Sequence, residues 1–389
     1  MHSEKPKILF VTLRTFSLTG GVEKVSRGIG FALKKLEREG EINFQMISLY
    51  DENGDEKYVP KKNFKGYQGK RLNGMLGSIK SGLSADIVIL SHINLAPVGW
   101  AIKRLRPSVR VIVWTHGVEI WRPLNMIKRS FLKICDNVVA VSRFTANEIQ
   151  RLHNTGQKSV TVIPNALDPF FKVPDLSDNK LRCQAEELRI RHGIPTGQKV
   201  FMALTRLRIT EKNKNYDKVI RLLGELKKEG RTFSYVLCGK YDIEEESRIK
   251  SVAAAAGMES ELILTGFVED KDLSTYYVMA DAFVLPSTKE GFGLAFIEAQ
   301  ACGLYVLAGN TDGSTEAVRS SEAGILVDPT EDTEIRAALN ILLERDSSFQ
   351  ERIANQEQCL AYFNFERFEE DLEALIPIKK TNITLNPIN

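Results

Sequence analysis

The chain has 389 residues, of which 43% are apolar and 26% are charged, and its formal net charge is +3. This length and composition predict a globular protein of two or three domains. No apolar run reaches the ~18 residues of a transmembrane helix, which argues against a membrane-spanning segment.

The charge is unevenly distributed along the chain. Residues 1–170 carry 26 lysines and arginines against 14 acidic residues, whereas residues 171–389 carry 27 against 36. This asymmetry predicts an anionic partner for the first half. The basic clusters at 57–71, 103–110 and 122–133 are each typical of a solvated surface, but together they favour an anionic membrane or a lipid-pyrophosphate acceptor. We expect no nucleic-acid partner, because no recognition fold or aromatic-interleaved basic stretch is present.

The cysteines and the N-terminus indicate a compartment. The five cysteines are scattered, and no pair has metal-ligand or redox spacing. Most lie in apolar surroundings, which is typical of core residues in a reducing cytoplasm. Residues 1–7 lack the apolar core of a signal peptide. We therefore expect a cytoplasmic protein, either free or at the inner face of the membrane.

Strands and helices alternate through the first half of the chain. Short apolar runs bounded by turn residues predict buried strands, and apolar residues at helical spacing predict helices that cover a parallel sheet. The predicted strands are 7–12, 44–49, 87–90, 111–114, 137–141 and 160–163, with helices at 22–38 and 144–153.

A proline-rich and charged stretch at 171–197 interrupts this pattern, and a second alternating series follows it. We interpret the stretch as a linker with a helix around 181–191. The expected domains are therefore 1–170 and 198–355. A helical region is expected at 349–375, broken near residue 364, and a C-terminal helix is expected at 356–376. Residues 377–389 are expected to form a flexible tail. The later strands are predicted at 200–204, 234–238, 262–265, 282–285, 305–308 and 324–327, with helices that include 215–228 and 244–256.

The most informative segment runs from Glu290 to Glu298. It follows the apolar strand 282–285 and reads as a strand, a glycine-rich turn and the start of a helix. Backbone N–H groups at such a helix start attract phosphate, and ionised carboxylates accept strong hydrogen bonds from hydroxyl groups. A nucleotide sugar offers hydroxyl groups at both ends and a diphosphate between them. A lone pair of glutamates at this spacing would more often be a solvated loop residue and an ordinary helix residue.

Other motifs occur in a fixed order around this segment. With Glu290 to Glu298, they closely resemble the retaining GT-B glycosyltransferases of the family-4 type, over roughly residues 6–375. The segments are Gly20-Gly21-Val22-Glu23, Thr115-His116-Gly117, Val139-Ala140-Val141-Ser142-Arg143, Val162-Ile163-Pro164-Asn165-Ala166, Thr205-Arg206-Leu207, Lys214-Asn215-Tyr216-Asp217 and Leu264-Thr265-Gly266-Phe267-Val268.

The resemblance implies a fold and an activity. The fold is α/β of the GT-B type, with two facing Rossmann-like doubly wound domains and a C-terminal helix that crosses back to the first domain. The N-terminal domain would bind a glycan or lipid-linked acceptor, and the C-terminal domain a UDP- or GDP-sugar. The reaction would be hexosyl transfer with retention of configuration in polysaccharide biosynthesis.

The resemblance also implies roles for particular residues. Arg206 and Lys214 would grip the diphosphate, although Lys214 is displaced by about three positions from the usual spacing and Lys212 is a rival. His116 would contact the sugar near the reacting carbon, and His92, at an equivalent strand end, is a candidate for the acceptor pocket. Glu290 would bind the transferred sugar and Glu298 the ribose. The remaining donor contacts would come from Gly20, Gly21, Gly266, Phe267, Val268, Phe292, Gly293 and Leu294.

Two features bear on the chemistry. The sequence has no convincing Asp-x-Asp at a strand end, so we expect no metal cofactor and assign the neutralisation of the diphosphate to basic side chains and helix N-termini. No carboxylate is obviously positioned as a nucleophile, so we favour attack on the same face, with the departing phosphate oxygen as the base. Tyr305 and Asp312-Gly313 depart from the family pattern near the donor end, so the donor cannot be taken from known members.

Two alternatives stay open. The first is another GT-B enzyme, such as a sugar-nucleotide epimerase. The second is a non-catalytic GT-B protein that binds a nucleotide sugar or a glycan.

Overall fold

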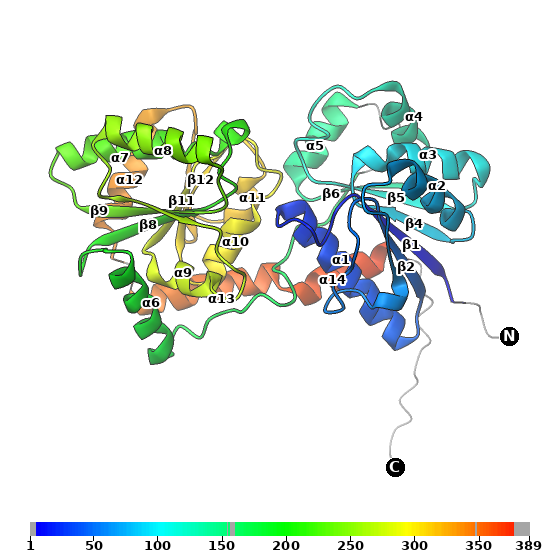
Figure 1. Cartoon of the computed structure of the whole chain (residues 1–389), viewed down its shortest axis with the longest axis horizontal. Helices are drawn as coiled ribbons and strands as arrows, with labels where there is room; N and C mark the ends of the chain where they lie inside the picture. Colours follow the sequence, from blue (N-terminus) through cyan, green and yellow to red (C-terminus); the bar gives the residue numbers. More distant parts are fainter. Residues whose placement is uncertain (1–4, 154, 156–159, 347, 377–389) are drawn as a thin grey trace, which may run out of the picture. The chain divides into compact units, whose positions relative to one another are not determined.

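A computed structural model describes residues 5–153, 155, 160–346 and 348–376. The chain forms two compact units, one of Met1–Pro169 with Phe365–Asn389 and the other of Phe170–Asn364. Each unit is a parallel sheet covered by helices on both faces (Figure 1). The predicted pair of Rossmann-like domains is therefore confirmed.

The first unit contains a seven-stranded sheet in the order β3-β2-β1-β4-β5-β6-β7, and every neighbouring pair is parallel. Its central strands are continuous apolar runs because helices cover both faces of the sheet. The strands are β1 (Lys7–Thr12), β2 (Asn43–Ser48), β3 (Phe64–Gly66), β4 (Ile87–Leu90), β5 (Arg110–Thr115), β6 (Asn137–Ala140) and β7 (Val160–Val162).

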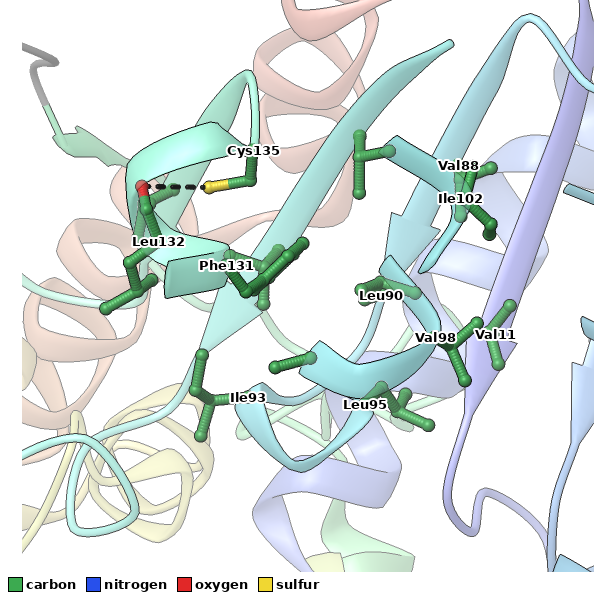
Figure 2. Packing of buried hydrophobic residues seen from close by; sticks show 14 of the residues in the cluster. Val11, Val88, Leu90, Ile93, Leu95, Val98, Ile102, Phe131, Leu132 and Cys135 are labelled. Carbon is green, nitrogen blue, oxygen red and sulfur yellow. Dashed lines mark hydrogen bonds between the residues drawn. The ribbon is translucent and has the colours of Figure 1, made fainter. Parts of the chain in front are cut away.

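Helices α2, α3 and α4 pack side by side over one face of this sheet (Figure 1). Figure 2 shows the core beneath them, where Val88 and Leu90 of β4 meet Ile102 of α3 and Phe131 of α4. The helices of the unit are α1 (Gly21–Glu39), α2 (Arg71–Gly82), α3 (Ala96–Leu105), α4 (Met126–Ile134), α5 (Arg143–Leu152) and α14 (Phe365–Leu375), with 3-10 turns η1 (Lys61–Asn63) and η2 (Ile93–Leu95).

The C-terminal helix α14 completes the first unit. Its Phe365 ring packs edge-on against Phe31 of α1, with ring centroids 5.6 Å apart. Lys35 of α1 donates a hydrogen bond of 2.7 Å to Glu369 of α14. The chain therefore returns to its first domain, as expected.

The second unit contains a six-stranded parallel sheet in the order β10-β9-β8-β11-β12-β13. Helix α6 precedes β8 and packs on α9, and α13 packs on α10. The strands are β8 (Lys199–Leu204), β9 (Phe233–Cys238), β10 (Leu262–Gly266), β11 (Ala282–Leu285), β12 (Tyr305–Gly309) and β13 (Gly324–Val327). The helices are α6 (Asn179–Arg191), η3 (Ile209–Lys214), α7 (Tyr216–Lys228), α8 (Ile243–Ala256), α9 (Leu273–Met279), α10 (Leu294–Ala301), α11 (Ser314–Val318), α12 (Asp332–Glu344) and α13 (Phe349–Phe363).

The structure refines one of the predicted boundaries. The helix expected at 356–376 spans parts of two helices, α13 and α14, which are separated at the break predicted near residue 364 because the chain is extended at Asn364. Within 5–153, 155, 160–346 and 348–376, no helix is both long and apolar enough to cross a membrane. The tail predicted at 377–389 lies outside the described residues.

Candidate functional site

The predicted donor residues of the second unit gather at the carboxyl edge of its sheet. Arg206 and Lys214 follow β8, and Glu290 follows β11, which pairs directly with β8. In a parallel sheet these strand ends share one edge, which is where ligands of doubly wound folds bind.

Lys214 and Glu290 form the closest contact at this edge. The Lys214 Nζ lies 2.5 Å from the Glu290 Oε1, and each side chain is only 15% exposed. Lys212, the rival candidate, is exposed. The geometry therefore joins Lys214, rather than Lys212, to the predicted sugar-binding glutamate.

The backbone holds the two loops of this pair together. The Thr288 N–H donates to the Asn213 carbonyl at 2.9 Å, and the Asn215 side chain donates to the Pro286 carbonyl at 2.7 Å. Asn215 adopts a left-handed conformation with φ 58°, which ends η3 and begins α7. The loops after β8 and β11 thus form one connected structure.

Asp312, which follows β12, fixes the backbone of Glu290. Its buried carboxylate accepts hydrogen bonds from the Glu290 N–H at 2.7 Å and the Ser314 N–H at 2.9 Å. The Gly313 N–H also donates to the Glu290 carbonyl at 2.9 Å. Burial raises the pKa of Asp312 to about 6, although the two N–H donors oppose that shift. The sequence marked this position only as a departure from the family pattern.

Arg206 lies at the same edge but has a different partner. Its side chain is 54% exposed, and its guanidinium lies 2.9 Å from the Glu211 carboxylate. An exposed ion pair of this kind contributes little to stability. The cation is therefore accessible to an anionic ligand.

Glu298 is almost fully buried on α10. The Tyr277 hydroxyl donates to its Oε2 at 3.1 Å, so little of the carboxylate surface is open to a ligand. Phe292 is also a core residue, since its ring packs edge-on against Phe363 with centroids 5.6 Å apart. Only the backbone of Phe292 could therefore contact a donor.

The glycines of this edge permit unusual backbone conformations. Gly293 precedes α10 at φ +96°, and Leu294 begins the helix. Gly266 adopts φ +72° at the end of β10, and its carbonyl accepts a hydrogen bond of 2.8 Å from the Gly239 N–H. After it, Phe267 is 55% exposed and Val268 is buried.

Gly20, Gly21 and His116 belong to the first unit, so they lie in a different unit from Glu290 and Lys214. Gly20 is the N-cap residue of α1 and Gly21 is its first residue. The His116 ring Nε2 lies 2.8 Å from the Ser91 carbonyl, and a carbonyl can only accept, so Nε2 carries the hydrogen.

A pocket of about 330 Å³ opens at the carboxyl edge of the first sheet, where β1, β2 and β4 end. His92, which follows β4, is among the residues that line this pocket. The pocket is also lined by Val22 and Glu23 of the Gly20–Glu23 motif and by Arg71 of the basic cluster 57–71. The remaining lining residues, which the sequence did not single out, are Leu13, Arg14, Tyr50 and Ser91.

The His92 ring is neutral at physiological pH. Its Nδ1 accepts a hydrogen bond of 2.9 Å from the Asn94 N–H, so the remaining ring hydrogen is on Nε2. Burial lowers the pKa of His92 to about 4, with the nearby His116, Lys128 and Arg122 acting in the same direction against Glu119. The Nε2–H of His92 can therefore donate a hydrogen bond, whereas Nδ1 already accepts one from the Asn94 N–H.

Comparison with known families identifies the chain. Residues 52–170 match the profile described as Glycosyltransferase Family 4, and residues 184–358 match the profile described as Glycosyl transferases group 1. The chain belongs to the GT-B glycosyltransferases of the family-4 type. The resemblance of its motifs to that family is thereby confirmed.

This glycosyltransferase has curated relatives among mannosyltransferases. It is 27% identical over 245 residues to the GDP-mannose-dependent alpha-(1-6)-phosphatidylinositol monomannoside mannosyltransferase of Mycolicibacterium smegmatis, with 60% of this chain and 61% of the relative covered. It is 28% identical over 237 residues to the serotype-specific mannosyltransferase WbdA of Escherichia coli, with 60% and 28% covered. The matches thus span less than two thirds of either relative.

Solved structures share the fold of the glycosyltransferase. Sucrose-phosphate synthase from Thermosynechococcus elongatus has a TM-score of 0.75 at 17% identity, over 95% of this chain and 98% of that one. Anabaena HepE in complex with UDP has a TM-score of 0.74 at 17% identity, over 95% and 99%. At these identities the likeness confirms the predicted GT-B fold.

Proposed function

We propose that this glycosyltransferase moves a hexose from a UDP- or GDP-sugar to a hydroxyl group of a glycan or lipid-linked acceptor. The observation that carries the proposal is the contact between Lys214 and Glu290, which places an ammonium and a carboxylate together where β8 and β11 end. A carboxylate accepts strong hydrogen bonds from sugar hydroxyls, and an ammonium stabilises a departing diphosphate.

The relatives support this class of donor. The mycobacterial relative is described as GDP-mannose-dependent, and HepE has been solved with UDP and with UDP-glucose. Arg206 and Lys214 would hold the diphosphate here, together with the N-terminus of α10. These groups supply the positive charge that a metal ion supplies in other transferases, so we propose a reaction that needs no metal. Undiminished turnover in EDTA would support metal independence.

We propose that the reaction retains the donor's anomeric configuration, as the resemblance to the family implies. The Glu290 Oε1 is paired with Lys214 and the Glu290 backbone N–H is bound by Asp312, which suits a binding role better than that of a nucleophile. We therefore assign Glu290 to substrate binding, and the departing phosphate oxygen to the role of base on the same face. NMR of the first-formed product would show the donor's anomeric configuration, and an inverted product would refute this step.

Turnover is the direct test of the activity. The purified full chain, supplied with nucleotide sugars and a lipid or glycan extract, should release nucleoside diphosphate and form a glycosylated product. Glu290→Gln should lower that rate by roughly 100-fold, in line with the loss of one charged transition-state contact. Wild-type protein that binds the donor without turnover would instead indicate a non-catalytic binding protein.

We also propose that the first unit contacts an anionic membrane. Helices α2, α3 and α4 contain no acidic residue, yet they expose several large apolar side chains between lysines and arginines. This combination is typical of surfaces that bind anionic lipid. The exposed apolar residues are Leu72 and Leu76 on α2, Leu105 on α3, and Met126 and Ile127 on α4.

A further inference from the structure

The pocket of the first unit contains two arginines that share one aromatic ring. The Arg14 guanidinium carbon lies 4.9 Å from the centroid of the Tyr50 ring, and that of Arg71 lies 5.2 Å from the same centroid. The two guanidinium carbons therefore lie at most about 10 Å apart, and like charges at that range repel each other unless an anion offsets them. Stacking on the ring holds both guanidinium groups at the pocket while leaving their N–H donors free to bind.

Neither arginine has an acidic partner within the part of the chain that the structure describes. This contrasts with Arg206, which is paired with Glu211. Glu23, in the first turn of α1, is the acidic residue among those that line the pocket, and no ion pair links it to either arginine. The pocket thus retains a surplus of positive charge.

The backbone around Arg14 is rigid. The buried Asp51 carboxylate accepts hydrogen bonds from the Thr15 N–H at 2.7 Å, the Ser17 N–H at 2.9 Å and the Ser48 hydroxyl at 2.7 Å. These bonds join the loop after β1, which carries Arg14, to the segment after β2. Arg14 is therefore placed by a preformed scaffold.

Arg71 is positioned by a tight turn. The Gly69 N–H donates to the Leu49 carbonyl at 2.9 Å, and Gln68 and Gly69 both adopt positive φ angles, of 51° and 80°. The turn lies beside Tyr50, and α2 begins at Arg71 directly after it. Both arginines thus reach the same ring from rigid segments.

The other polar groups of the pocket suit a hydroxylated ligand. His92 offers its Nε2–H as a neutral donor, and Glu23 offers acceptors to hydroxyl groups. A volume of about 330 Å³ is at the lower end of the range for small-molecule sites. A monosaccharide or polyol with one phosphate group fits this combination of size, charge and hydrogen bonding.

We propose that this pocket binds a phosphate-bearing group of the acceptor, with Arg14 and Arg71 as its clamp. The inference depends on the proposed function, since it names the chemical class of the acceptor. The phosphate belongs either to a soluble sugar phosphate or to a lipid headgroup. Planar guanidinium groups bind phosphate oxygens in a bidentate manner, which explains two arginines at one ring.

Binding assays on the full chain test the clamp with two phosphate monoesters. Glucose 6-phosphate, compared with glucose, represents the soluble source. Phosphatidic acid in phosphatidylcholine vesicles, compared with phosphatidylcholine alone, represents the lipid source. At least one monoester should bind the wild-type chain more tightly than its uncharged counterpart. The double variant Arg14→Gln/Arg71→Gln should weaken that binding roughly 10- to 100-fold, as expected for two charge-assisted contacts.

Arg38→Gln is the matched control. Arg38 is an exposed arginine in the last turn of α1, roughly 22 Å along that helix from Glu23 at 1.5 Å per residue, so its loss should leave phosphate binding unchanged. Arg14→Lys/Arg71→Lys, which keeps the charge but not the fork geometry, should give intermediate affinity. Unchanged melting temperatures would show that the variants are folded.

Measurement of nucleotide-sugar binding distinguishes a failure of the phosphate clamp from a failure of the proposed function. The double Gln variant should bind the donor as wild type does, because neither arginine is among the predicted donor contacts, and the charged ones, Arg206, Lys214 and Glu290, lie in the second unit. Loss of donor binding in that variant would overturn the inference, as would wild-type affinity of the variant for both monoesters. Failure of wild type to bind either monoester would overturn it as well. A wild-type chain that binds phosphate but no nucleotide sugar would instead contradict the proposed function.

Discussion

The Lys214 ammonium and the Glu290 carboxylate lie 2.5 Å apart, and both side chains are largely shielded from solvent. The two residues are 76 positions apart in the sequence, and the pairing of β8 with β11 brings them together. A shielded ion pair depends on both partners, because removing one leaves an uncompensated charge.

Lys214→Met should therefore impair both binding and turnover. We expect kcat/KM to fall by roughly 100- to 1000-fold, because a charge that stabilises the leaving diphosphate is lost and Glu290 is left unpaired. Steady-state kinetics measure the loss. Lys212→Met is the control, since Lys212 is exposed and only two positions away, and it should retain activity within about twofold. Equal losses in both variants would contradict the assignment of Lys214.

Asp312 should make a pH-dependent contribution to stability. Its folded pKa of about 6 lies above the ordinary aspartate pKa of 3.8, so its contribution is fully present below pH 3.8 and is lost as the pH rises through 6. The free energy of unfolding of wild type, relative to Asp312→Asn, should therefore fall by up to about 3 kcal/mol between pH 4 and pH 7.

Urea unfolding at several pH values measures this difference, and subtraction of the two proteins removes the titration of all other groups. Asp328→Asn is a suitable control, because Asp328 lies on the surface with its pKa lowered by hydrogen bonds to Thr330. A wild-type advantage over Asp312→Asn that rises from pH 4 to pH 7 would contradict the burial of a raised-pKa carboxyl at this position.

Gly293→Ala should distort the start of α10. A Cβ atom at this position would lie 2.4 Å from the Phe296 ring, and the backbone adopts φ +96°. We expect a loss of stability of roughly 2–4 kcal/mol together with weaker donor binding. Gly193→Ala is the matched control, because Gly193 also has a positive φ of +70° but meets nothing within 4 Å. If both variants melted at the same temperature, the close contact with Phe296 would be refuted.

The proposed membrane face depends on apolar side chains of α4. Met126→Asp/Ile127→Asp should reduce the fraction that pellets with anionic vesicles severalfold, because both side chains are exposed and flanked by basic residues. Ile243→Asp is the control, since Ile243 is 84% exposed on α8 of the other unit. Equal pelleting with neutral and anionic vesicles would discard the electrostatic part of this proposal.

The sequence predicted the sheets well because their strands are apolar runs, such as Val88 and Ile89, that are buried whatever their neighbours. It did not predict α2, α3 and α4, whose partly exposed apolar residues blur the helical periodicity. The candidate donor-binding residues at the edge of the second sheet were predicted mainly from the order of the family motifs. The choice between Lys212 and Lys214 required the structure, because η3 and the left-handed Asn215 decide which side chain faces Glu290.

The arginine pocket could not be predicted for a related reason. Arg14 and Tyr50 are brought together by the parallel pairing of β1 and β2, and the turn at Gly69 adds Arg71. Such contacts join segments that are distant in the chain, so they leave no local pattern in the sequence. The sequence signals were the excess of basic residues in the first half of the chain and the position of His92 after a strand.

In the proposed function, the edge of the second sheet binds a nucleotide sugar through Arg206, Lys214 and Glu290. Thermal unfolding of the full chain with a panel of UDP-, GDP- and ADP-sugars is the decisive measurement of this binding. One donor should stabilise the wild type, by about 2.7 kcal/mol at 100 times its dissociation constant, and should stabilise Arg206→Gln/Lys214→Met far less. A panel in which no nucleotide sugar raises the melting temperature, or in which the variant responds like wild type, would contradict the account.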